Sequence, residues 1–91
     1  MGSKEIKFLD EIKGQEPIVV VRILDVYLQT HCDDEEAYIT RGLNHWKLEH
    51  RREAINDYLK ALELNPQSRA KTLLQFANSI LDFYSKDLLN P

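Results

Sequence analysis

The strongest constraint on the fold is a set of small and aromatic residues that recur at helical spacing in the middle of the chain. The run reads Tyr38-x-x-Arg41-Gly42-x-x-His45, then Ala54-x-x-x-Tyr58-x-x-Ala61, and it ends at Pro66. Two antiparallel helices approach closely only where one of them lacks bulk, so we expect Gly42 and Ala54 at a helix crossing, with the two tyrosines filling the volume around it. The pattern therefore predicts a tight helical hairpin that Pro66 terminates.

This pattern resembles the tetratricopeptide repeat, a helix–turn–helix unit of about 34 residues. Gly42, Ala54, Ala61 and Pro66 match the family's small and terminating positions with the right separations, and the resemblance covers residues 35–68. The other interpretation is an unrelated helical hairpin that happens to carry small residues at its crossing. Agreement over the whole unit favours the repeat.

Two residues depart from the family pattern. Arg41 and His45 stand where the family usually has leucine and tyrosine. We expect Arg41 to lay its aliphatic stem along the seam between the helices and to keep its guanidinium in water. We expect His45 to be a partly buried histidine that hydrogen-bonds to a neighbour.

The flanking parts of the chain look like incomplete versions of the same unit. Turn-forming residues near positions 14–17, 32–34, 49–50 and 65–68 divide the chain into five segments of helical length. Residues 1–34 keep the apolar positions of a repeat without its small residues, and residues 69–91 supply one capping helix and a tail. We therefore predict an all-α fold of five helices, with antiparallel hairpins stacked as a short right-handed array in a single domain over residues 1–91.

The second segment is the ambiguous one, because β-branched residues dominate positions 18–23 and favour a strand locally. No other run in the chain is suited to pair with it, and a lone strand leaves its backbone groups without partners. We therefore predict a helix there, with Pro17 in its first turn.

Polar residues mark where the later helices begin. Asp33 or Asp34 is placed to cap the third segment, with Glu36 completing a capping box. Ser68 is placed to cap the last helix, which we expect to run to about residue 85.

The composition excludes several classes of partner. The 91 residues carry a net charge of −3 and are 43% hydrophobic, which is typical of a folded soluble protein and gives no general footprint for nucleic acid or anionic membrane. The most apolar run, residues 18–28, contains charged residues, is too short to span a bilayer and lacks the flanks of a signal peptide. We expect a cytoplasmic protein that binds neither nucleic acid nor membrane.

Motifs for catalysis or metal binding are nearly absent. The three glycines lie far apart, which excludes a glycine-rich phosphate loop. Cys32 is the only cysteine, which excludes an intrachain disulfide and a multi-cysteine zinc site. The ligand types at residues 31–34 are adjacent on a helix end and point in different directions, so we interpret them as an acid-capped turn. The stretch from His45 to His50 resembles the inverted zincin motif but has one residue too many. We predict no enzyme, no cofactor and no metal site.

The third segment carries a second apolar stripe, formed by Ile39, Leu43 and Trp46. The resemblance to the repeat family implies that this stripe, with Lys47 beside it, lines the concave surface that holds partner peptides. Ile39 and Leu43 stand where chaperone-binding members carry the residues that clamp a terminal carboxylate, so this groove is expected to be hydrophobic. The alternative is that Ile39 and Leu43 pack against the first and last helices.

The last segment has more apolar surface than a capping helix needs. Phe76, Ile80 and Phe83 extend its apolar face, whereas a terminal repeat usually presents a polar outer surface. This surplus predicts a docking surface for a partner or for a second copy in a two-fold homodimer. The alternative is that the C-terminal tail folds back over it.

These observations lead to two functional hypotheses. The first is a non-catalytic protein–protein interaction module that binds a peptide, a protein or itself, with candidate contact residues Ile39, Leu43, Trp46, Lys47, Phe76, Ile80 and Phe83. The second is a regulatory or assembly subunit that uses Arg51 and Arg52 against an acidic partner. Salt separates the two, because charge-led binding weakens in high salt and apolar binding does not.

Overall fold

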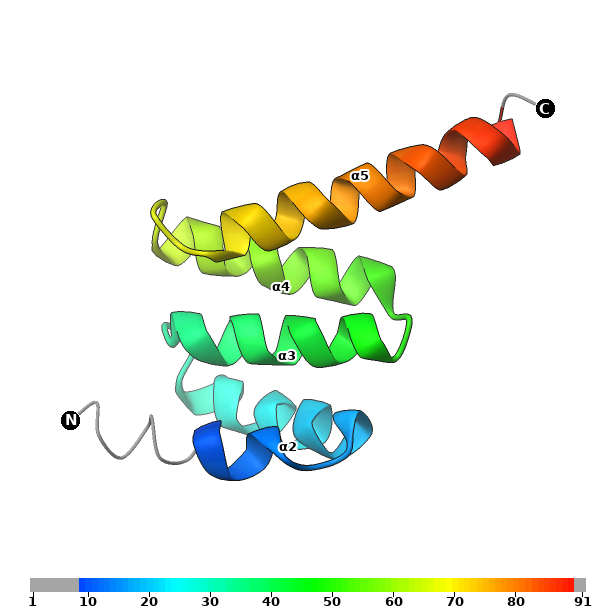
Figure 1. The fold of residues 1–91 in the computed structure, drawn as a ribbon. Helices are drawn as coiled ribbons and strands as arrows, with labels where there is room; N and C mark the ends of the chain where they lie inside the picture. Colours follow the sequence, from blue (N-terminus) through cyan, green and yellow to red (C-terminus); the bar gives the residue numbers. More distant parts are fainter. Residues whose placement is uncertain (1–8, 90–91) are drawn as a thin grey trace.

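A computed structural model of the chain describes the backbone of residues 9–89 and the side chains of residues 9–80. A short helical segment over residues 9–13 precedes α2 (Pro17–Thr30), α3 (Glu35–Lys47), α4 (Arg51–Leu64) and α5 (Ala70–Leu89). Successive helices run in opposite directions and stack in chain order, with α3 between α2 and α4, and α5 on the outer side of α4 (Figure 1). The predicted all-α array of five helices is confirmed within the described residues.

The β-branched segment is helical, as predicted. Pro17 lies in the first turn of α2, where its missing N–H costs nothing, and Val20 N donates to Glu16 O at 3.0 Å. Along α2 the residues that face inward are buried, and they are Val20, Val21, Leu24 and Leu28. Burial of this helical stripe outweighs the local strand preference of the β-branched residues.

The cap of α3 differs in detail from the prediction. Asp34 is the N-cap, and its Oδ1 accepts a hydrogen bond from Ala37 N at 3.1 Å. Ala37 therefore occupies the position that a capping box gives to glutamate, so the predicted role of Glu36 is wrong. Glu36 instead forms an ion pair with Arg69, which lies just before α5.

The start of α5 agrees with the prediction, whereas its end does not. Ser68 is buried, and its Oγ accepts a hydrogen bond from Ala70 N at 3.1 Å, which satisfies a donor of the first turn. The helix continues to Leu89, beyond the expected end near residue 85. No glycine or proline follows Ser68 until the last residue, so the sequence between them contains no strong terminator.

The turn between α3 and α4 has a specific backbone geometry. His50 N donates to His45 O at 2.9 Å, and Glu49 N donates to Trp46 O at 3.0 Å, which together form a Schellman motif. Glu49 occupies the left-handed position of this motif with φ 63°, where glycine is usually found. The motif folds the chain back so that His50 lies beside His45.

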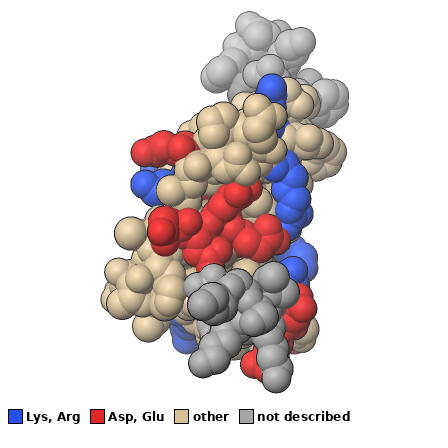
Figure 2. Space-filling model, turned by 90° about the vertical axis from the view of Figure 1, so that its left-hand side faces the viewer, with Lys and Arg blue, Asp and Glu red and all other residues tan. Residues whose placement is uncertain are grey.

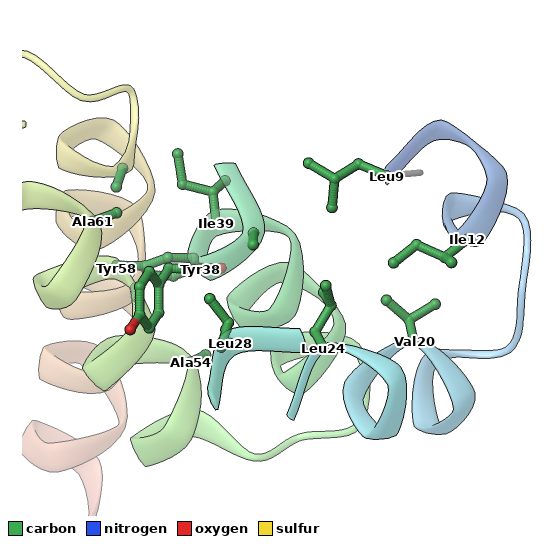
Figure 3. Close-up of a cluster of buried hydrophobic side chains, with 13 residues drawn as sticks. Leu9, Ile12, Val20, Leu24, Leu28, Tyr38, Ile39, Ala54, Tyr58 and Ala61 are labelled. Atoms are coloured by element: carbon green, nitrogen blue, oxygen red, sulfur yellow. The ribbon is translucent and has the colours of Figure 1, made fainter. Parts of the chain in front are cut away.

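The core extends through the stack from the first helical segment to α5. Leu9 and Ile12 lie next to Val20 at one end, and Tyr58 and Ala61 of α4 contribute at the other (Figure 3). The surrounding buried residues include Leu24, Leu28, Ala37, Tyr38, Ile39, Ala54, Ala70 and Ala77. The apolar stripes of all the helices thus merge into one cluster among the described residues.

Gly42 lies at a close approach of α3 and α4. A Cβ atom on Gly42 would lie 2.7 Å from Cε1 of Tyr58 and 3.1 Å from Cβ of Asp57, which is closer than side-chain atoms normally approach. The close approach predicted at Gly42 is therefore confirmed, although its nearest neighbour is Tyr58 rather than Ala54. We call this contact surface of α3 with α4 the α3–α4 seam.

Arg41 does not keep its guanidinium in water. Its Nε and Nη2 donate to the two carboxylate oxygens of Asp57 at 2.9 and 2.7 Å, and Nη1 donates to Asp25 at 3.0 Å. Burial raises the pKa of Asp57, and the hydrogen bonds from Arg41 oppose this rise. One side chain of α3 thereby connects α2 and α4, because the buried carboxylate requires a partner.

Candidate functional site

A small apolar pocket opens between α3 and the first half of α5, with α4 beneath it. Its lining comes from all three helices and consists of Leu43, Trp46, Tyr58, Leu73, Phe76 and Ala77. Its volume is about 120 Å³. We call this pocket and its rim the α3–α5 groove.

The groove brings together three of the residues predicted from the sequence. Leu43 and Trp46 come from α3 and Phe76 comes from α5, which is 30 residues later in the chain. Leu43 and Trp46 are partly buried, whereas Phe76 is 60% exposed. A wall made of one exposed aromatic ring and two partly covered side chains can accept an apolar group from another molecule.

Ile39 is a correction to the predicted set. It has 0% exposure and belongs to the core, so a partner cannot reach it in this fold. It lies one turn before Leu43, near the N-terminal end of α3, and the turn before α5 contacts that end of the helix. Asn65 Nδ2 donates to Glu35 Oε1 at 3.0 Å, and Arg69 pairs with Glu36. The apolar stripe of α3 is therefore covered at its beginning and open at its end.

The remaining predicted residues lie outside the lining of the groove. Lys47 is exposed at the end of α3, directly after Trp46, and Ile80 is partly buried on α5, one turn beyond Phe76. Phe83 lies on α5, but its side chain falls outside the described residues. The binding roles of these three residues stay predictions.

Sequence reasoning missed the contribution of Leu73 and Tyr58 to the groove. Leu73 lies three residues before Phe76 and four before Ala77, so helical periodicity places all three on one face of α5. Tyr58 is 2% exposed and faces Gly42 on one side, while it also lines the groove. The spacing alone indicated the face of α5, but it did not indicate that Tyr58 is shared by the seam and the groove.

Comparison with protein-family models connects this geometry to a known unit. The model described as "Tetratricopeptide repeat" matches residues 35–68, the same residues that form α3, α4 and the turn that follows. Residues 35–68 form a tetratricopeptide repeat. No curated protein and no solved structure matched the chain in the other two comparisons. Tetratricopeptide repeats are protein–protein interaction modules and typically serve as non-catalytic scaffolds.

Within the repeat, Arg51 holds Trp46 in place. The guanidinium carbon of Arg51 lies 4.1 Å from the centroid of the Trp46 ring, and Arg51 Nη1 donates to Trp46 O at 2.9 Å. The stacking adds a cation–π attraction, and the hydrogen bond is a second one to a carbonyl that already accepts from Glu49 N. Arg51 therefore contacts an aromatic wall of the groove, and its expected role in a charged docking surface stays a prediction. Arg52 is exposed.

A cluster of acidic side chains lies at the opposite end of α3 from the groove. They are most evident on the end of the molecule where α3 begins (Figure 2), which contains residues 33–36. Negative charge is favourable at a helix N-terminus, and Asp34 serves there as the cap. This cluster is accounted for by local structure.

The described residues contain no group of three or more His, Cys, Asp or Glu side chains that is arranged to hold a metal ion. Among the same residues, no helix has the length and apolar character that crossing a membrane requires.

Proposed function

We propose that the α3–α5 groove binds a segment of a partner protein by accepting one of its apolar side chains. The observation that carries the proposal is the convergence of Leu43, Trp46 and Phe76, from two separate helices, on a single apolar pocket. The tetratricopeptide repeat supports a protein partner in general. The groove suggests the chemistry by which such a partner would be recognised.

The size of the pocket limits what can enter it. A volume of about 120 Å³ suits a single aliphatic or small aromatic side chain rather than a cofactor. Full burial of such a side chain contributes about 1.5–3 kcal/mol, and covering the exposed ring of Phe76 adds to this. We therefore expect moderate affinity for a linear segment, with one dominant apolar anchor.

The rim adds a preference for charge. Arg51 stacks on Trp46, and Lys47 follows Trp46 on the exposed end of α3. Positive charge beside an apolar pocket favours an acidic residue near the anchor of the bound segment, mainly through faster association and orientation.

A random peptide library selected against the full chain tests this proposal. We expect enriched peptides to share one large apolar residue, and we expect Trp46→Ala and Phe76→Ala to weaken their binding by at least about tenfold. Val26→Ala is the matched control, because Val26 is 66% exposed on α2, away from the groove. Peptides that bind the two groove variants as well as they bind the original chain would refute the proposal.

Salt dependence separates the groove from the charged alternative. The apolar part of binding through the groove should persist between about 0.1 and 0.5 M salt, because apolar burial is not screened, whereas the contribution of the charged rim should weaken. A partner that is lost in high salt and on Arg52→Ala, but not on Phe76→Ala, would instead support the assembly subunit with a charged surface.

Self-association through α5 is a further proposal from the same surplus of apolar surface. Light scattering over a range of concentrations should then show a dimer that Phe76→Ala or Phe83→Ala weakens. A strict monomer at the highest concentration would leave the groove free for a different protein.

A further inference from the structure

Two histidine side chains meet at the turn between α3 and α4. Nδ1 of His45 lies 3.2 Å from Nδ1 of His50, and the ring centroids are 5.4 Å apart with a tilt of 47°. The Schellman motif creates this approach by folding the backbone at Glu49. His45 is partly buried, as expected from the sequence, and His50 is exposed.

The distance between the two nitrogens has a chemical meaning beyond a hydrogen bond. A zinc ion binds imidazole nitrogen at about 2.0–2.1 Å, so two ligands at the tetrahedral angle lie about 3.3–3.4 Å apart. Neighbouring ligands in a square-planar site would lie closer, at about 2.9 Å. The observed 3.2 Å is nearer to the tetrahedral value.

Carboxylates lie close to His45. His45 lines a hollow of about 340 Å³ together with Asp25, Arg41, Glu53, Asn56 and Asp57, so three carboxylates face one guanidinium. Asp25 and Asp57 already accept hydrogen bonds from Arg41. Glu53 lies three residues after His50, in the first turn of α4, and it has no ion pair within the described part of the chain.

We propose that His45 and His50 bind a zinc ion as a pair of imidazole ligands, with water in the remaining coordination positions. Glu53 then balances the charge of the ion and accepts hydrogen bonds from its bound water. No third side chain is already in a ligating position among residues 9–80, so the site is a two-ligand site on this chain. Such an ion joins the end of α3 to the start of α4 and rigidifies the turn beside Trp46.

Zinc titration of the full chain by calorimetry tests this site. We expect one equivalent of zinc chloride to bind at pH 7.5, and we expect His45→Gln or His50→Gln to weaken binding by at least about tenfold. His50→Gln is the more informative variant, because the His50 side chain is exposed and makes no capping hydrogen bond. The circular dichroism spectrum of His50→Gln should match that of the original chain, which would show that its fold is unchanged.

The other histidine and the cysteine of the described chain supply the matched control. His31 and Cys32 lie in the turn between α2 and α3, and Cys32 is an exposed free thiol that can itself attract zinc. The double variant His31→Gln with Cys32→Ser should bind zinc as well as the original chain. Zinc binding that is lost in this control and kept in His50→Gln would overturn the proposal, as would the absence of saturable binding.

Thermal unfolding gives a second, independent measurement. A ligand that binds only the folded state raises the melting temperature as its concentration exceeds the dissociation constant. Excess zinc should therefore raise the melting temperature of the original chain and of the His31/Cys32 control, but not that of His50→Gln. An equal shift in all three proteins would show that zinc acts elsewhere.

Discussion

The same helix, α3, makes one interface that is filled and one that is open. In the α3–α4 seam, Gly42 allows the ring of Tyr58 to approach within contact distance, and Arg41 is held by both oxygens of Asp57. In the α3–α5 groove, Leu43 and Trp46 are only partly covered, and Phe76 is 60% exposed. The divergence of α5 from α4 along its length is visible in Figure 1.

The difference shows which sequence signals indicate which kind of interface. Small residues and paired charges mark the seam, because two helices can approach only where bulk is missing and buried charges are matched. The groove is indicated by large apolar residues in excess of those that the core buries. Tyr58 belongs to both surfaces, so the rigidity of the seam also fixes the floor of the groove.

The largest effect expected in the seam comes from removing the charge partner of Asp57. Arg41→Ala leaves the carboxylate of Asp57, whose side chain is 6% exposed, without its ion pair, and should cost about 3 kcal/mol in the free energy of unfolding. The pKa of Asp57 should then rise further, because the hydrogen bonds that oppose the effect of burial are gone. Urea unfolding followed by circular dichroism measures the loss.

A second variant separates the uncompensated charge from lost packing at this position. Combining Arg41→Leu with Asp57→Leu removes both charges and should recover much of the stability. A cost below about 0.5 kcal/mol for Arg41→Ala would show that the seam does not depend on this ion pair.

Gly42→Ala is expected to have the next largest effect. The new methyl group would meet Cε1 of Tyr58 at 2.7 Å, so the ring must move, at a cost of about 1–3 kcal/mol. The control is Gly14→Ala, where an added Cβ meets nothing within 4 Å and stability should not fall. Because Tyr58 also lines the groove, Gly42→Ala should weaken peptide binding as well. Equal melting temperatures for Gly42→Ala and Gly14→Ala would contradict a tight seam.

A change at the turn between the helices should increase stability. Glu49 has φ 63°, so Glu49→Gly removes the strain of a side chain in the left-handed region and should add about 1 kcal/mol. Glu49→Ala keeps the Cβ atom and should add nothing, although both variants lose the 4.0 Å contact with Arg51. Equal stabilities of the two variants would argue against strain at this position.

The smallest effect on stability is expected in the groove. Phe76→Ala removes a ring that is 60% exposed and should change the free energy of unfolding by about 0.5 kcal/mol or less. Leu24→Ala, at a site with 0% exposure, should cost about 2–5 kcal/mol and serves as the contrast. A large loss of stability for Phe76→Ala would show that this ring supports the fold, and not a partner.

The positions of the helices could be predicted from local signals in the sequence. Pro17, Asp34 and Ser68 lie where helices begin, and Gly42 lies where two helices touch. The helical state of α2 followed from the lack of a partner strand. These features depend on short-range stereochemistry, which spacing reveals.

The details of the site depended on contacts between distant residues, which spacing does not reveal. Ile39 and Leu43 are one turn apart with similar side chains, yet only Ile39 is fully covered. The turn before α5 is joined to the beginning of α3 by the hydrogen bond from Asn65 to Glu35. Arg51 stacks on Trp46, and Arg41 pairs with Asp57 across the seam. Charge and hydropathy indicated which residues to consider, whereas only the packed structure shows which partner each residue contacts.

The ion pairs of Arg41 also affect which helices unfold together. In an array of helical units, the number of units that unfold together depends on the strength of coupling between neighbours. Arg41 binds Asp25 on the preceding helix and Asp57 on the following one, so loss of either neighbour exposes the same buried charge. We expect α2, α3 and α4 to unfold as one cooperative unit, and the opening of α5 to be a separate, less costly event.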